Sequence, residues 1–259
     1  MLKSHPDRHA VILAAGKGTR MQSDLPKVAM PLNNRPMILH VLDQLLPLQL
    51  NTITIVVGYR REVVEDLVNQ WKAENNTSSE IHFAIQQEQK GTAHAFLQSE
   101  AVLSNQTGFA LVTAGDMPLL RTLSLETLFN EVASGASGAV LSAQLENPKG
   151  YGRMVRDSNG NLDRIVEEKD ADEPTKKINE VNTGCYVFQI PEIFDLLKRI
   201  DSNNNQNEYY LPDAIRLYRQ NGNLFKCVQL TDYRESMGAN TRDDLVTLEE
   251  IYKQMLNRL

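Results

Sequence analysis

The chain has 259 residues, and its content of 41% hydrophobic and 23% charged residues indicates a folded globular protein rather than a disordered one. Its 27 Lys and Arg against 33 Asp and Glu give a net charge of −6, which disfavours non-specific binding to nucleic acid. No apolar run reaches the roughly 20 residues that a membrane-spanning helix needs, so neither a nucleic acid nor a membrane is expected as a partner.

The N-terminal sequence and the cysteines predict a cytoplasmic location. The first apolar stretch continues directly into a glycine-rich loop, which is unlike the pattern of a signal peptide. Cys185 and Cys227 each stand alone in an apolar run, as small core residues of a protein in a reducing compartment do. A disulfide between them is the less favoured alternative.

The first half of the chain alternates between strand and helix patterns. In chain order it predicts a strand at Ala10–Ala14, a helix at Pro36–Leu46, a strand at Thr52–Val57, a helix at Arg60–Trp71, a strand at Ile81–Ile85, a helix at Thr92–Leu103 and a strand at Phe109–Thr113. Compact apolar strands that alternate with helices indicate a mostly parallel sheet with helices on its faces. The polar stretch Ala73–Glu80 is predicted to be a surface loop.

The second half changes character and predicts an antiparallel insertion. Strands are expected at Ala139–Ala143, Gly152–Arg156, Leu162–Glu167 and Gly184–Gln189, with a hairpin turn at Asp157–Asn161 and a surface loop at Asp201–Glu208. Helices are expected at Pro191–Arg199, Pro212–Gln220 and Thr241–Leu259. We expect one continuous α/β domain over residues 1–259, made of two halves (about 8–135 and 136–240) and a C-terminal helix (241–259).

A glycine-rich loop follows the first strand directly, from Leu13 to Met21. Its small residues let a ligand approach the backbone, and free N–H groups in such a loop can hold a phosphate. The loop is neither a P-loop nor a dinucleotide fingerprint, because Met21 stands where the latter needs its third glycine. Arg20 and Lys27 add two cations, which suit a polyphosphate. A tight turn with solvated charges accounts for the loop equally well.

The segment Leu13–Lys27 (LAAGKGTRMQSDLPK) resembles the signature loop of the sugar nucleotidyltransferases, and in particular that of the uridyltransferase domain of bifunctional N-acetylglucosamine-1-phosphate uridyltransferase/glucosamine-1-phosphate acetyltransferases. The resemblance implies a Rossmann-like fold, with a mixed, mostly parallel sheet flanked by helices and an antiparallel sugar-binding insertion. It implies that the half over 8–135 binds the nucleotide and the half over 136–240 the sugar. It further implies that Arg20 and Lys27 contact the phosphates and that the loop binds substrate through Leu13, Ala14, Ala15 and Gly16.

The segment Gln86–Ala95 (QQEQKGTAHA) runs from the end of a strand to the start of a helix. Gln86 can donate and accept hydrogen bonds at once, which matches the imide edge of a pyrimidine. Gly91 and Thr92 stand at a helix N-terminus, and a simple helix cap is the plain alternative. The resemblance assigns all three residues to uracil, whereas His94 by itself is better explained by packing than by catalysis.

Asp116 follows Gly115 at the end of an apolar strand, where α/β sheets place their ligands. A carboxylate there is a natural oxygen ligand for Mg²⁺, although a lone aspartate at a strand end is usually a turn former. The resemblance implies that Gly115 binds substrate and that Asp116 and Asn240 hold Mg²⁺ together. Ala114 departs from the family pattern, because close relatives usually carry a tyrosine at this position.

Four further motifs resemble the sugar-binding segments of the family. They are Gly150–Arg153 (GYGR), Ile165–Asp170 (IVEEKD), Val181–Gly184 (VNTG) and Asn207–Asp213 (NEYYLPD). The resemblance implies substrate contacts by Gly152, Glu167, Lys169, Asn182, Thr183 and Tyr210. Within that set, Gly152 faces the acyl group, Glu167 accepts from sugar hydroxyls and Asn182 binds the amino sugar, while Lys169 is otherwise a solvated charge. Pro212 replaces the usual threonine.

The implied reaction joins UTP and N-acetylglucosamine-1-phosphate, with Mg²⁺ as cofactor. A related transferase for another sugar phosphate or for thymidine triphosphate is the first alternative, and a non-catalytic sensor of nucleotide sugars is the second. A zinc site at His5 and His9 is weaker, since no cysteine is nearby. No hexapeptide repeat precedes the last residue, Leu259, so acetyl transfer is not expected. No pattern predicts an oligomeric state.

Overall fold

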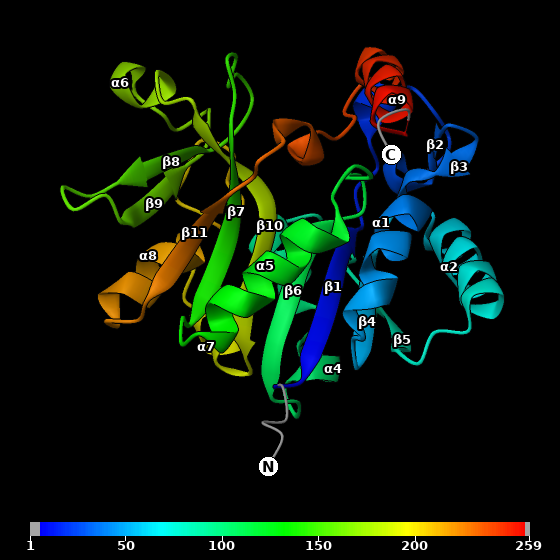
Figure 1. Cartoon of the computed structure of the whole chain (residues 1–259), viewed down its shortest axis with the longest axis horizontal. Helices are drawn as coiled ribbons and strands as arrows, with labels where there is room; N and C mark the ends of the chain where they lie inside the picture. The colour runs from blue at the N-terminus through cyan, green and yellow to red at the C-terminus, as the bar shows by residue number, and fades with distance from the viewer. Residues whose placement is uncertain (1–5, 257–259) are drawn as a thin grey trace.

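The computed structural model describes residues 6–256, which form a mixed sheet with helices on both faces (Figure 1). Across the sheet the strands run in the order β11 (Phe225–Gln229), β7 (Gly138–Gln144), β10 (Glu180–Ile190), β6 (Gly108–Ala114), β1 (Arg8–Ala14), β4 (Thr52–Val57) and β5 (Glu80–Ile85). Strands β6, β1, β4 and β5 are mutually parallel, and β10 is antiparallel to its neighbours β6 and β7. The parallel part corresponds to the predicted nucleotide-binding half.

The helices are α1 (Met37–Leu45), α2 (Arg61–Asn75), α3 (Thr92–Leu97), α4 (Glu100–Leu103), α5 (Thr122–Ala133), α6 (Glu173–Lys176), α7 (Glu192–Leu197), α8 (Asp213–Gln220) and α9 (Arg242–Leu256). A small hairpin of β2 (Pro31–Leu32) and β3 (Arg35–Pro36) precedes α1. Within the described residues, no helix has the length and apolar character to cross a membrane.

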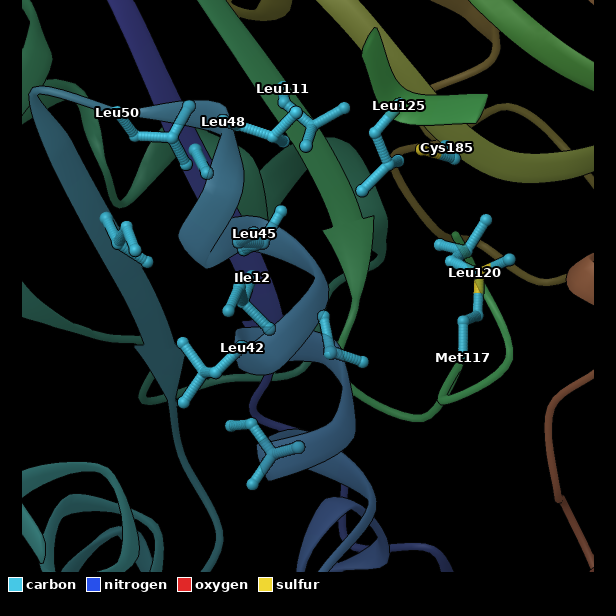
Figure 2. Packing of buried hydrophobic residues seen from close by; sticks show 14 of the residues in the cluster. Ile12, Leu42, Leu45, Leu48, Leu50, Leu111, Met117, Leu120, Leu125 and Cys185 are labelled. Carbon is cyan, nitrogen blue, oxygen red and sulfur yellow. The ribbon is translucent and has the colours of Figure 1, made fainter. Parts of the chain in front are cut away.

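Alternation along β1 divides the core into two layers. Ile12 packs with α1 and α5 on one face, whereas Val11 packs with Phe96 of α3 and Ile193 of α7 on the other. Figure 2 shows the first layer, in which Leu42 and Leu45 of α1 lie beside Ile12. Because both faces of the sheet are covered, the polar groups that can meet a ligand lie at the strand ends and in the loops that follow them.

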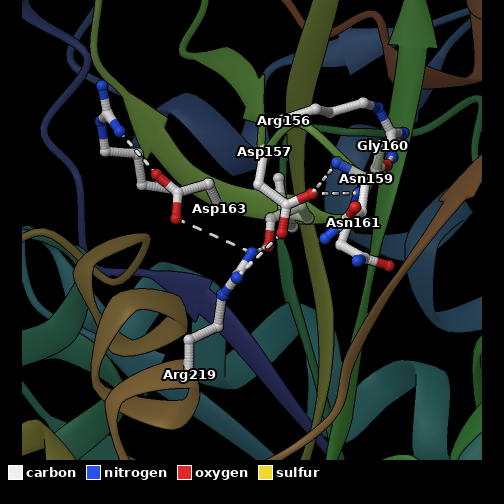
Figure 3. Close-up of polar contacts among 9 residues, drawn as sticks. Arg156, Asp157, Asn159, Gly160, Asn161, Asp163 and Arg219 are labelled. Atoms are coloured by element: carbon white, nitrogen blue, oxygen red, sulfur yellow. Dashed lines mark hydrogen bonds and ion pairs between the residues drawn. The ribbon is translucent and has the colours of Figure 1, made fainter.

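The insertion is a hairpin of β8 (Arg153–Arg156) and β9 (Leu162–Val166), and β8 joins the main sheet through β10. The predicted turn at Asp157–Asn161 is confirmed. Figure 3 shows the Asp157 carboxylate at its centre, where Oδ1 accepts from the backbone N–H groups of Asn159 at 3.0 Å and Asn161 at 2.9 Å. Arg219 of α8 donates to the other oxygen of Asp157 at 3.0 Å, which ties the hairpin to the domain.

Most of the predicted elements are confirmed to within a few residues, and the exceptions have physical reasons. The expected helix Thr92–Leu103 is divided into α3 and α4, because the buried Ser99 hydroxyl donates to the Phe96 carbonyl at 2.7 Å and competes with helical pairing. Residues 73–75 belong to α2 instead of a loop, and β10 begins at Glu180, four residues earlier than expected. Helix α5 and strand β11 were not predicted.

Two predictions touch residues outside the described range. The expected last helix is α9 as far as Leu256, and residues 257–259 lie beyond it. His5 also lies outside the described residues, so the zinc alternative is judged on His9 alone. His9 is buried, and its ring bonds Thr52 Oγ1 at 2.7 Å and the Thr107 carbonyl at 3.2 Å. Its two nitrogens are therefore engaged in structural contacts.

Candidate active site

The loop after β1 brings a lysine and an arginine to the edge of the sheet. Gly18 has a φ of +65°, and a Cβ atom built on it would lie 2.8 Å from the Cβ of Lys27. Only glycine therefore lets the loop fold back against Lys27 without strain. The two alanines, Ala14 and Ala15, are buried, whereas Gly16 is exposed.

Four of the predicted residues meet at this edge although they are far apart in sequence. The Lys27 ammonium forms an ion pair with the Asp116 carboxylate and donates to the Asn240 amide oxygen at 2.6 Å. The Arg20 guanidinium donates to the same amide oxygen at 3.2 Å. Asp116 follows β6, which lies beside β1, and Asn240 precedes α9. The site is thus assembled from the ends of the chain and its middle.

The contacts of Lys27 test whether Asp116 and Asn240 fit a metal ion. A single ammonium touches an oxygen of each, so the two oxygens converge on one cation position. Carboxylate and amide oxygens are the donors that Mg²⁺ prefers, and Mg²⁺ usually takes few protein ligands and completes its shell with water and substrate phosphate. No cluster of three or more His, Cys, Asp or Glu side chains suited to a metal occurs among residues 6–256. The two residues therefore fit a magnesium ion that is shared with a substrate.

A cavity of about 210 Å³ lies between the loop after β1 and the N-terminus of α3. Its wall is linked to the cation group through Leu13, whose carbonyl accepts from the N–H of Gly115, the residue before Asp116, at 3.0 Å. Six residues predicted for substrate binding line it, namely Leu13, Ala15, Gly16, Gln86, Gly91 and Thr92. Gln89, Ala95 and Glu208 complete the wall and were not predicted. Gln89 donates to the Ala15 carbonyl at 2.7 Å and so joins the two loops. A glutamine in a polar loop has no spacing that marks it, which is why sequence analysis missed it.

Gly91 holds this cavity in shape, and its replacement should be costly. Its φ is +107°, and a Cβ built on it would lie 2.5 Å from the Tyr209 carbonyl oxygen. We expect Gly91→Ala to lower the free energy of unfolding by about 1–3 kcal/mol and to weaken nucleotide binding. Urea unfolding and nucleotide titration measure the two effects. Gly222→Ala is the matched control, because Gly222 has a φ of +74° with open space around it. Equal losses in both variants would contradict the role assigned to the Tyr209 contact.

The predicted sugar-binding residues lie around the β8–β9 hairpin and the loop before α8. Glu167 follows β9 and lies against Gly152, where a built Cβ would be 3.0 Å from its carboxylate oxygen. Glu167 and Tyr210 line a cavity of about 250 Å³. The Gln206 amide donates to the Tyr210 hydroxyl at 2.6 Å and accepts from Lys169 at 2.5 Å. Gln206 therefore connects Tyr210 and Lys169, two predicted residues whose pairing no motif indicates.

Three other predicted residues have contacts that also serve the fold. The Asn182 amide donates to the buried Tyr186 hydroxyl at 2.7 Å, and its oxygen accepts from the Gly184 N–H at 3.0 Å. The Thr183 hydroxyl donates to the Leu141 carbonyl at 2.9 Å. A Cβ on Gly115 would lie 3.0 Å from a side-chain methyl of Val28, so the packing around this glycine is tight. Their substrate contacts stay predictions.

Glu167 carries the most shifted carboxyl group of this half of the site. Burial, followed by the nearby carboxylates of Asp170, Asp213 and Glu208, raises its pKa to about 7. The proton is then held more tightly in the folded chain than in the unfolded one. The stability that this proton contributes is complete below the ordinary pKa of a glutamate and is lost as the pH rises through about 7.

We therefore expect the free energy of unfolding of the wild-type chain to fall, relative to that of Glu167→Gln, by about 2 kcal/mol between pH 5 and pH 8. The glutamine keeps the shape of the side chain but cannot ionise. Urea unfolding of both proteins at several pH values measures the difference. Parallel pH profiles would show that Glu167 is ionised throughout this range.

Comparisons with known proteins relate the chain to a family. A family model described as "Nucleotidyl transferase" matches residues 9–253. The protein named "Bifunctional protein GlmU" from Oceanobacillus iheyensis is 43% identical over 252 residues, which make up 97% of this chain and 53% of that protein. The protein of the same name from Bacillus cereus is 43% identical over 253 residues, again 97% and 53% of the two chains. The chain thus spans about half the length of these curated relatives.

Solved structures show the same fold. A UDP-glucose pyrophosphorylase in complex with UDP-glucose superposes with a TM-score of 0.77 at 18% identity, and covers 96% of this chain and 99% of its own. A putative glucose-1-phosphate thymidylyltransferase from Bacillus anthracis, in complex with a sucrose, has a TM-score of 0.74 at 19% identity and covers 94% of both chains. These likenesses confirm the predicted mostly parallel sheet with helices on its faces.

Proposed function

The chain belongs to the nucleotidyl transferase family, and from this premise we propose that it transfers a uridylyl group from UTP to N-acetylglucosamine-1-phosphate. The products of this reaction are UDP-N-acetylglucosamine and pyrophosphate. The likeness to the proteins named GlmU supports this choice of substrates, since it extends over 97% of the chain.

One observation carries the proposal. Two cations, Arg20 and Lys27, meet one carboxylate and one amide oxygen at the sheet edge, and the loop after β1, which carries Arg20, also lines a cavity that has Gln86 in its wall. This arrangement suits a ligand with an anionic chain at one end and a planar hydrogen-bonding ring at the other. A nucleoside triphosphate has that form, and the carboxyl edge of a parallel sheet is where such ligands bind.

In the proposed reaction, an oxygen of the sugar phosphate attacks the α-phosphorus of UTP. A new phosphorus–oxygen bond forms, and the bond from the α-phosphorus to the oxygen that bridges to the β-phosphorus breaks, so that pyrophosphate leaves with the electron pair. The attacking phosphate is already ionised, so no general base is required. The main obstacle is repulsion between two anions, which fixed cations and correct positioning reduce.

Each part of the site has a role in this scheme. Arg20 and Lys27 offset the negative charge that grows on the departing pyrophosphate. Asp116 and Asn240 would hold Mg²⁺, which supplies further neutralisation of the phosphate charge. Glu167 and Asn182 orient the sugar by hydrogen bonds, and Lys169 holds its phosphate. These roles rest on the family resemblance together with the positions described above.

Two other functions are alternatives to the proposed uridylyl transfer. Ala114 and Pro212 depart from the family pattern, which leaves room for another sugar phosphate or for thymidine triphosphate. A non-catalytic sensor of nucleotide sugars is disfavoured, because a sensor has no need to keep both cations and both metal-binding oxygens in contact.

Pyrophosphate release, measured over a panel of nucleoside triphosphates and sugar-1-phosphates, tests the proposal. We expect release only when both substrates and Mg²⁺ are present, and fastest release with UTP and N-acetylglucosamine-1-phosphate. A clear preference for another sugar phosphate would replace the substrate but keep the reaction. No release with any pair would contradict a transferase and favour the sensor.

A further inference from the structure

We propose that His94 fixes the orientation of the Gln86 amide and thereby makes the base cavity select uracil over cytosine. His94 is then a positioning residue that acts through Gln86 and does not itself touch the base. This inference deepens the proposed function and rests on it.

The hydrogen bonds of Gln86 define which end of its amide faces the cavity. Gln86 follows β5 directly, and its side chain is only 4% exposed. Its amide nitrogen lies 3.3 Å from the Gly91 carbonyl oxygen and 3.0 Å from Nδ1 of His94. A carbonyl can only accept, so the contact with Gly91 identifies the nitrogen end. Two partners engage the two hydrogens of this nitrogen, and the oxygen is the atom left for a ligand.

The orientation requires that His94 accept a hydrogen bond at Nδ1, and its surroundings favour that state. Burial, and then the charge of Lys90, lower the pKa of His94, while Glu88 acts weakly in the opposite direction. A neutral ring that accepts at Nδ1 carries its proton at Nε2. The amide of Gln98 lies 3.4 Å from Nε2, but its short bond, at 2.8 Å, goes to the His94 carbonyl. The Gln86 contact is therefore the one that uses the ring lone pair.

The two pyrimidines differ at the atom that would meet the Gln86 oxygen. Uracil has an N–H at position 3 of its ring and can donate to this oxygen. Cytosine has a lone pair there, so two acceptors would face each other without a bond. A site that holds an acceptor in place rejects the base that lacks the donor, because a buried polar group is left unpaired.

The His94 ring also lines a second cavity, of about 310 Å³, between α3 and α7. The ring can therefore exchange a proton with solvent from the outer side while a base occupies the inner cavity. The charged and titratable groups nearby are Glu88 and Lys90 before α3, Lys198 at the end of α7, and Glu208 and Tyr209 in the facing loop.

Protonation of His94 should weaken the preference for uracil. The imidazolium carries a proton on both ring nitrogens, so its Nδ1–H would face the amide hydrogens of Gln86. The amide then loses its bond to Nδ1, and the Gly91 carbonyl alone holds its nitrogen. The Gln86 oxygen is therefore fixed less firmly toward the base, and the discrimination against cytosine weakens. The preference for UTP over CTP should consequently decrease as the pH falls below the ordinary range of a histidine.

Binding of UTP and CTP to the full-length chain in EDTA, measured by calorimetry at pH 5.5 and pH 8, tests the inference without catalysis. The wild-type chain should prefer UTP at pH 8 and lose much of this preference at pH 5.5. In His94→Leu the preference should fall about threefold to tenfold at pH 8, the worth of one hydrogen bond. In His94→Asn the side-chain oxygen takes the place of Nδ1 and cannot titrate, so the preference should persist at both pH values.

Gln98→Leu is the matched control, because Gln98 contacts the same ring from the side away from the base. It should leave the ratio of UTP to CTP affinity unchanged. The inference is overturned if His94→Leu keeps the full preference, or if His94→Asn shows the same pH dependence as the wild type. If His94→Leu does not fold, the inference is tested by comparing His94→Asn with the wild type in the pH dependence of their preference for UTP over CTP. Equal binding of purine and pyrimidine triphosphates by the wild type would instead contradict the proposed function.

Discussion

Replacing Asp116 with alanine should lower kcat by about 10²–10³-fold, the usual loss when one preorganised electrostatic group is removed. Asn240→Ala should cost less, because Asn240 contributes a neutral oxygen whereas Asp116 contributes a charge. Both oxygens converge on the Lys27 ammonium and therefore on one cation position. Because the two substitutions disable the same ion, the double variant should lose far less than the product of the two single losses.

A double-mutant cycle in kcat, repeated over a range of Mg²⁺ concentrations, measures this coupling. Excess Mg²⁺ should partly restore Asn240→Ala, since the stronger ligand is still present. Asp195→Ala is a suitable control, because its side chain is 89% exposed on α7 and distant from the site. Single losses that multiply, or an Asn240→Ala variant that is insensitive to Mg²⁺, would show that the two residues do not share an ion.

The second large effect is expected for the cations of the loop after β1. Arg20→Ala and Lys27→Ala should each lower kcat by about 10²-fold or more, because the charge on the departing pyrophosphate then has less compensation. The fold should survive both changes, since neither side chain belongs to a core layer. The loss of stability should be larger for Lys27→Ala than for Arg20→Ala, because the Lys27 side chain is only 17% exposed and its removal leaves Asp116 without its partner. Pyrophosphate release measures kcat and thermal unfolding measures stability, and both should be determined on the same preparations.

Lys27→Arg sharpens this prediction, because it keeps the charge but changes its shape. It should retain more activity than Lys27→Ala without matching the wild type, since a planar guanidinium does not reproduce the contacts of the ammonium with Asp116 and Asn240. Lys253→Ala serves as the control, because the Lys253 side chain is 58% exposed on α9 and pairs with Glu249. Variants of Arg20 and Lys27 that fail to fold would show that these charges are structural.

Local patterns were sufficient for those parts of the fold that neighbouring residues determine. The run Thr52–Val57 is β-branched and fully buried, and its predicted bounds are the observed ones. Helix α5 was missed although Leu125, Leu128 and Phe129 have helical spacing. The edge strand β11 was also missed, although it is as long as β9, which was predicted. The division between α3 and α4 depends on one serine hydroxyl, which no periodicity reveals.

The candidate site, like the fold, could be predicted from the sequence only in part. Motifs named the residues of the base cavity and of the cation group, but they could not show that Lys27 bonds to Asn240 across 213 positions of sequence. The contributions of Gln89 and Glu208 to the cavity, and the bond between His94 and Gln86, likewise depend on how separate loops meet. Such contacts arise from tertiary structure and leave no mark on either segment alone.

In the absence of substrate, the Lys27 ammonium neutralises the Asp116 carboxylate of the same site. A phosphate oxygen that draws the ammonium away from Asp116 leaves that carboxylate without a partner, and the affinity of this spot for a cation then rises. Thermodynamic linkage would make the effect mutual, so a divalent ion held by Asp116 and Asn240 would free the Lys27 ammonium to contact a polyphosphate. Anion and metal would thus assist each other's binding through a single side chain that exchanges one partner for the other, and neither would bind as tightly alone as in the other's presence.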